Sequence, residues 1–152
     1  IGVEQDHRAE VAKSLAKFLA STYTLYMKTL YYHWNVTGSN FHSLHALFDD
    51  QYNELHEAGD TIAERIRALG HFTPGTFKDY VELSQVTEDD KLPKNSTIMI
   101  SNLLKDNEIC SRQARETLKI AEEAQDEVTV DMMVERMAIH DEAAWMLRST
   151  QQ

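Results

Sequence analysis

Glycine and proline are scarce in this sequence of 152 residues. It has five glycines and two prolines, and both prolines, Pro74 and Pro93, lie in its middle. So few helix-breaking residues leave room for long uninterrupted helices on either side. A chain of this length forms one compact domain and is too short for two full ones. We therefore expect a single domain over residues 1–152.

Cysteine, positive charge and long apolar runs are also in short supply. The single cysteine, Cys110, excludes an internal disulfide and suits a reducing compartment. The net charge of -10 argues against a nucleic-acid-binding groove and favours an affinity for cations. No apolar run is long enough to span a bilayer, and the opening residues IGVEQDHRAE lack a signal-peptide core. We expect a cytoplasmic protein without membrane association.

Apolar residues recur at helical spacing in four long stretches, and no stretch alternates as a strand does. The expected helices run from about Asp6 to Asn35, from about Asn40 to Gly70, from an N-cap at Asn95 or Ser96 to about Ala124, and from about Thr129 to Ser149. The pattern predicts an all-α protein.

The connection between the second and third helices is roughly 25 residues long, which is unusual for a plain loop. Its middle, FKDYVELS, is expected to form a short helix of its own. A connection of this length can cross a bundle from end to end. The predicted architecture is therefore a ferritin-like four-helix bundle with one long crossover connection that carries a short extra helix.

The second long helix carries two pairs of potential metal ligands. His45 and Asp49 are four residues apart, as are Asp60 and Glu64, so each pair shares one helix face. At about 100° per residue, all four side chains point along one stripe. Imidazole and carboxylate ligands together suit iron, with zinc or manganese as competitors. His33, near the end of the first helix, can reach the His45 end across the following turn.

The positions of these pairs are symmetric, although a single acidic pair is more often only a solvated helix face. Positions 45 and 64, and positions 49 and 60, are centred on the same point between Glu54 and Leu55. Asp49 and Asp60 lie about 16 Å apart along one helix, which is too far to bind one ion. A two-fold axis at this midpoint would bring the first pair of one chain against the second pair of another copy. It would create two equivalent sites per dimer.

The run YYHWNVTGSNFHSLHALFDDQYNELHEAGDTIAERIRALG resembles the signature of the Dps family, also called mini-ferritins. The resemblance continues in the C-terminal HDEAAWMLRS and covers nearly the whole chain. It implies a hollow dodecamer that oxidises Fe(II) with hydrogen peroxide or oxygen and stores the ferric mineral. It also implies that the ferroxidase ligands between subunits are His33, His45, Asp49, Asp60 and Glu64.

The resemblance also draws attention to an acidic segment and to two tryptophans. The resemblance implies that the segment EEAQDEVTVD lines a three-fold pore that concentrates Fe(II). Asp131 is the best candidate for a pore residue and Asp126 is next. The alternative is that the segment is only a solvated helix end. Trp34 and Trp145 either intercept oxidising equivalents near the site or are two large core aromatics.

Two other functions remain as alternatives. The first is a nucleoid-associated protein that compacts DNA without significant iron chemistry. It needs a basic arm, and neither the N-terminal residues nor the C-terminal STQQ supply one, so we predict no direct DNA binding. The second is a helical oligomer without metal chemistry, which would make the symmetric spacing of the ligand pairs a coincidence.

Overall fold

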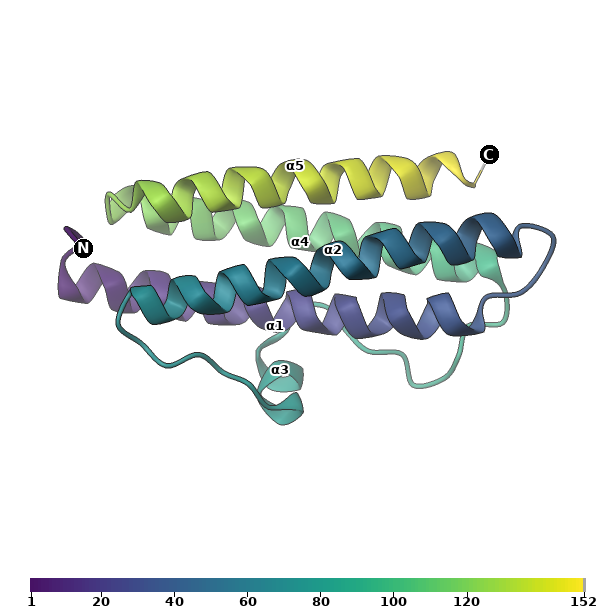
Figure 1. The fold of residues 1–152 in the computed structure, drawn as a ribbon, viewed down its shortest axis with the longest axis horizontal. Helices are drawn as coiled ribbons and strands as arrows, with labels where there is room; N and C mark the ends of the chain where they lie inside the picture. Colours follow the sequence, from purple (N-terminus) through teal and green to yellow (C-terminus); the bar gives the residue numbers. More distant parts are fainter. Residues whose placement is uncertain (152) are drawn as a thin grey trace.

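The computed structural model describes residues 1–151, and the regular secondary structure of this part of the chain is all helical, without a strand (Figure 1). Its helices are α1 (Gln5–Asn35), α2 (Phe41–Ala68), α3 (Phe77–Leu83), α4 (Ser96–Glu123) and α5 (Glu127–Ser149). The predicted all-α class is confirmed, and so is the short extra helix. None of the helices in residues 1–151 is both long enough and apolar enough to cross a membrane.

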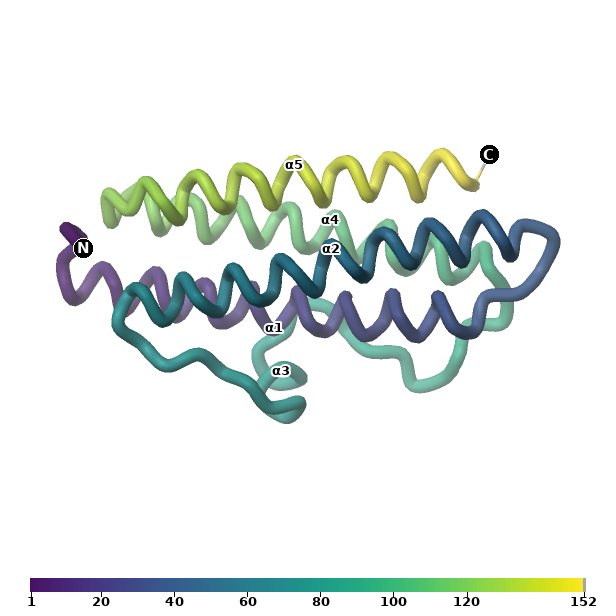
Figure 2. The backbone as a smooth tube through the Cα atoms, in the orientation of Figure 1, coloured from purple at the N-terminus to yellow at the C-terminus, as the bar shows by residue number. Residues whose placement is uncertain are grey.

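The four long helices form two antiparallel hairpins, α1 with α2 and α4 with α5 (Figure 2). The hairpins pack together mainly where α1 lies against α4. Between the hairpins, the chain leaves the end of α2, passes along α1 through α3, and enters α4 at the opposite end of the bundle. The one-crossover topology expected from the long connection is therefore confirmed.

Side-chain caps set the starts of α4 and α5. The Asn95 carboxamide accepts a hydrogen bond from the backbone N–H of Ile98 at 3.0 Å, so Asn95, one of the two predicted candidates, is the N-cap of α4. The expected start of the last helix at Thr129 was wrong by two residues. Asp126 caps α5 by accepting from the N–H of Thr129 at 3.1 Å, and the helix therefore begins at Glu127.

The core is built from the apolar stripes of the four long helices. Its largest fully buried apolar side chains include Leu15, Phe18, Phe48, Ile62, Leu103, Met133 and Leu147. Phe41 is apolar but lies outside the core and is 42 % exposed. Phe41 is the first residue of α2, at the end of the bundle. Its ring stacks on His45, with centroids 5.0 Å apart.

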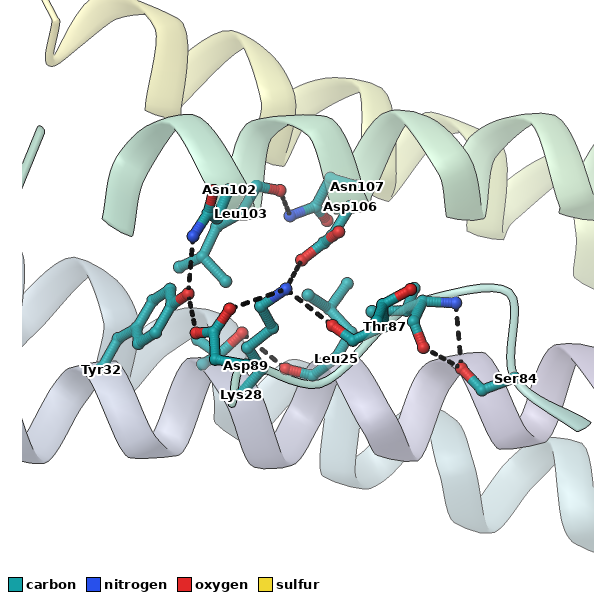
Figure 3. A network of polar contacts seen from close by, with 12 residues as sticks. Leu25, Lys28, Tyr32, Ser84, Thr87, Asp89, Asn102, Leu103, Asp106 and Asn107 are labelled. Carbon is teal, nitrogen blue, oxygen red and sulfur yellow. Dashed lines mark hydrogen bonds and ion pairs between the residues drawn. The ribbon is translucent and has the colours of Figure 1, made fainter. Parts of the chain in front are cut away.

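Buried polar groups attach the crossover to the bundle (Figure 3). Lys28 of α1 donates to the carbonyl of Thr87 at 2.8 Å and pairs with Asp106 of α4, also at 2.8 Å. The Tyr32 hydroxyl donates to Asp89. Burial, and then the bond to Asp89, raise the pKa of Tyr32, so the phenol keeps the proton it donates. These bonds fix the end of α1 that carries the neighbouring residue 33.

A second buried network joins α2, α4 and α5. Arg136 donates to both carboxylate oxygens of Glu54, at 2.5 and 3.0 Å, and to Nε2 of His140 at 3.1 Å. Because Nε2 accepts, the proton of the neutral imidazole sits on Nδ1, which donates to Oδ1 of Asn107 at 2.9 Å. Burial, and then the nearby Arg136 charge, hold the pKa of His140 well below its usual range.

This lowered pKa predicts acid sensitivity. Below about pH 6.5 the unfolded chain protonates residue 140 and the folded chain does not, so stability should fall by up to about 1.4 kcal/mol per pH unit. We expect the thermal unfolding midpoint to drop between pH 6.5 and 5. In His140→Gln, which keeps one donor and one acceptor but cannot titrate, the drop should be smaller. Equal pH slopes in the two proteins would contradict this role.

Candidate metal centre

His33 and His45 hold each other in one orientation at the turn between α1 and α2. Nδ1 of His33 donates to the carbonyl of His45 at 2.7 Å, and Nδ1 of His45 donates to the carbonyl of His33 at the same distance. The two rings stack with centroids 3.8 Å apart and 13° between their planes. A carbonyl oxygen only accepts, so each Nδ1 carries the proton. In the neutral rings each Nε2 therefore keeps a free lone pair, the form that binds a metal.

Asp49 adds a carboxylate to this pair of imidazoles. Its Oδ1 lies 3.9 Å from Nε2 of His33, one helical turn beyond His45 on α2. The Asp49 carboxylate also raises the pKa of the Tyr52 phenol. The ring of Tyr52 also lies edge-on to His33 with centroids 5.1 Å apart. Three of the predicted ligands therefore come together as one cluster, which we call the His–Asp half-site (His33, His45 and Asp49).

Asp60 and Glu64 form a second acidic pair further along α2, the Asp–Glu half-site. Both side chains are exposed on the helix surface. Eleven residues separate Asp49 from Asp60, about 16 Å of helix, so the two half-sites of one chain do not meet. Among residues 1–151, no three His, Cys, Asp or Glu side chains are grouped so that they would hold an ion by themselves. Each half-site has ligands of the right chemistry, and too few of them for a complete iron site.

The two candidate pore residues of the acidic segment EEAQDEVTVD differ in their exposure to solvent. Asp126 is buried and fully occupied: it accepts from the N–H and hydroxyl of Thr129 and from Nη2 of Arg65 at 2.6 Å. Asp126 therefore fixes the α4–α5 turn against α2, and we withdraw it as a candidate pore ligand. Asp131 is exposed on the first turns of α5, where its carboxylate is free to face a cation.

Neither tryptophan belongs to the core of this chain. Trp34 and Trp145 are each 59 % exposed, so the interpretation of both as core aromatics was wrong. Trp34 directly follows the predicted ligand His33 at the end of α1, and Trp145 lies on α5. Their exposure leaves the redox interpretation as a prediction.

Two residues with clear roles were missed at the level of the sequence. Tyr52 lies beside both His33 and Asp49, and Arg65, next to the ligand Glu64, anchors α2 to Asp126. Tyr52 has a signal in the sequence, because it is three residues after Asp49 and thus on the ligand face of the helix. Arg65 has no such signal, since its partner is 61 residues away.

A bundle of two helical hairpins with a single crossover, carrying paired histidine and carboxylate ligands, has the features of ferritin-like proteins. Residues 12–152 match the family model described as a ferritin-like domain. A low temperature-induced protein of Nostoc sp. is 38 % identical over 98 % of this chain and 84 % of its own length.

Comparison with solved structures shows which family of ferritin-like proteins the chain resembles. Dps from Staphylococcus aureus is 34 % identical, with a TM-score of 0.91 over 95 % of this chain and 96 % of its own. Dps from Vibrio cholerae, described as a member of the ferritin-like diiron-carboxylate superfamily, is 30 % identical, with a TM-score of 0.95 over 100 % of this chain and 95 % of its own. The chain therefore belongs to the Dps family of ferritin-like proteins.

Proposed function

We propose that this protein oxidises Fe(II) with hydrogen peroxide or oxygen and stores the ferric product inside a hollow dodecamer. The observation that carries the proposal is the pair of incomplete half-sites on α2. They are of matching chemistry and lie symmetrically about Glu54 and Leu55. A two-fold axis at that point joins the His–Asp half-site of one subunit to the Asp–Glu half-site of its partner.

An exposed apolar surface beside α2 supports such a dimer. Phe77 and Val81 of α3 are 84 % and 58 % exposed, and Met27 of α1 lies next to them. Together with His56 of α2 they line a groove of about 710 Å³. Exposed apolar side chains grouped in this way mark an interaction surface, and His56 is two residues from the midpoint of the half-sites. We propose that a second copy of the chain covers this surface.

The chemistry follows from the ligand types. The neutral Nε2 atoms of His33 and His45 hold Fe(II), and the carboxylates of Asp49, Asp60 and Glu64 favour the more highly charged Fe(III). Ligands that stabilise the product ion lower the barrier to electron loss. Peroxide takes two electrons and oxygen takes four, so the protein must combine the electrons of several ions. Asp131, exposed in the acidic segment, is proposed to concentrate Fe(II) at a pore.

The direct test is the initial rate of ferric absorbance after addition of Fe(II) and then peroxide. The double variant His45→Ala with Asp49→Ala should be strongly slowed, because every site loses both residues of one pair. The matched control is His42→Ala with Asp50→Ala, which removes the same residue types from exposed positions on the same helix. If the ligand double variant oxidises iron as fast as the parent, oxidation takes place elsewhere, for example on the mineral surface.

Direct DNA binding stays outside the proposal. The chain has 15 basic residues against 25 acidic ones, so it lacks the excess of positive charge that neutralises phosphates. We expect no shift of duplex DNA in a native gel at neutral pH and moderate salt. A salt-sensitive shift in the absence of divalent metal would favour the alternative of a DNA-compacting protein.

A further inference from the structure

A row of tyrosine rings lies along the α1–α2 hairpin and starts at the ligand His33. Tyr52 is edge-on to His33 with centroids 5.1 Å apart, and Tyr26 is edge-on to Tyr52 at 6.1 Å. Tyr23 follows Tyr26, again edge-on and at 6.1 Å. These separations are those of aromatic rings in direct contact. We call Tyr52, Tyr26 and Tyr23 the tyrosine row.

The far end of the tyrosine row lies beside the other half-site. A Cβ atom on Gly59 would come within 2.7 Å of the Tyr23 ring, so only a glycine lets this ring lie directly on α2. Glycine within a helix costs about 1 kcal/mol relative to alanine, and this close approach explains its place here. The next residue is Asp60. The Tyr23 ring therefore lies on α2 one residue before the Asp–Glu half-site.

The tyrosine row therefore connects two half-sites that, in the proposed dimer, belong to different iron sites. One end contacts the ligand His33, and the other lies against Gly59, the residue before the ligand Asp60. Among side chains without a thiol, the phenol of tyrosine and the indole of tryptophan lose one electron most readily. The row runs along the hairpin without an aliphatic residue between its rings.

We propose that the tyrosine row carries an electron between the two ferroxidase sites of a dimer, so that one peroxide is reduced by iron ions bound at both. The inference rests on the proposed function and concerns dimers with one Fe(II) at each site. At the first site the O–O bond of peroxide breaks. Fe(II) supplies one electron, and a tyrosine supplies one electron and its phenolic proton. The products are Fe(III), a tyrosyl radical, one hydroxide and one water.

The second iron then restores the tyrosine. Fe(II) at the other site gives one electron to the tyrosyl radical, which takes up a proton from water and returns to the phenol. In sum, two Fe(II) and one peroxide give two Fe(III) and two hydroxides, because the water formed in the first step balances the water that supplies the proton in the second. Peroxide receives both electrons within the protein and releases no hydroxyl radical.

The test compares Tyr26→Phe with the parent and with Tyr31→Phe. The phenylalanine at position 26 keeps the ring but resists oxidation, and among residues 1–151 the Tyr26 hydroxyl makes no side-chain hydrogen bond that would be lost. Tyr31 lies on the same helix, outside the row, with its ring against Tyr32. Each protein is loaded without oxygen with one Fe(II) per two sites or one per site, mixed with peroxide, and frozen for electron paramagnetic resonance.

In the parent and in Tyr31→Phe, a tyrosyl signal should appear at one Fe(II) per two sites and fall several-fold at one per site, because the second iron removes it. In Tyr26→Phe the radical on Tyr52 should persist at one Fe(II) per site, because the second iron can no longer reduce it through the row. If Tyr26→Phe matches the parent at both loadings while binding and oxidising Fe(II) normally, the electron transfer is refuted and the proposed function stands. If the parent binds no Fe(II) in anaerobic titration, both fail.

Discussion

Two inactive variants should regain activity when their subunits are mixed, if each iron site is shared across a two-fold axis. One variant carries His45→Ala and Asp49→Ala, and the other carries Asp60→Ala and Glu64→Ala. Each alone should be nearly inactive in peroxide-dependent iron oxidation, because every site lacks part of its ligand set. After dissociation, mixing and reassembly, a mixed dimer contains one site with both damaged halves and one site with neither.

The expected recovery has a definite size. With random pairing, half of the dimers are mixed and each has one whole site, so activity should return to roughly a quarter of the parent value. Mass spectrometry of the reassembled particles counts the mixed dimers, and each variant reassembled with itself is the control. Mixed dimers without recovered activity would show that the two halves do not meet across a two-fold axis.

Removal of Asp126 should produce the largest loss of stability in the acidic segment. Asp126→Ala removes the N-cap of α5, which is worth about 1 kcal/mol, and leaves Arg65 without its partner. Breaking a buried ion pair costs about 3–5 kcal/mol. Arg65 keeps some access to water, which lowers this cost. We therefore expect Asp126→Ala to lower the free energy of unfolding by about 3–4 kcal/mol in total. Asp126→Asn keeps an oxygen to cap the helix and should lose about half as much.

Asp131→Asn is the matched variant from the same acidic segment. Asp131 is exposed, so its replacement should change stability by less than about 0.5 kcal/mol. It should slow iron entry at low Fe(II), whereas the Asp126 variants should take up iron normally per assembled particle. Thermal unfolding and uptake at limiting Fe(II) measure the two effects separately. Slow uptake in folded Asp126→Asn would return that residue to the pore, and normal uptake in Asp131→Asn would leave the segment a solvated helix end.

The fold was predictable because its determinants are local in the sequence. Helical periodicity, few glycines and prolines, and the cap at Asn95 define the four long helices, and the length of the central connection requires a crossover. The error at the start of α5 has the same origin. The segment contains several acidic residues able to cap, and the selection of Asp126 depends on its contact with Arg65 of a distant helix.

The ligand pairs on α2 were also predictable from the sequence, since residues four apart on a helix share a face whatever the helix packs against. His33 was predicted from its place just before the turn, and the resemblance to a family repeated that prediction. The structure shows how its ring is held: His33 and His45 fix each other through reciprocal hydrogen bonds to backbone carbonyls. This lock depends on how tightly the turn brings α1 and α2 together.

By itself, the sequence determined the helices, their order and the ligand stripe, because each follows from spacing along one helix. Only the tertiary structure decided that Asp126 is a buried cap, that Trp34 and Trp145 are exposed, and that tyrosines from two helices form a row. Those features depend on which residues of different helices meet, and that is set by the packing of the hairpin. Gly59 is an example, because its missing side chain leaves room for the ring of Tyr23, a residue 36 positions earlier in the chain.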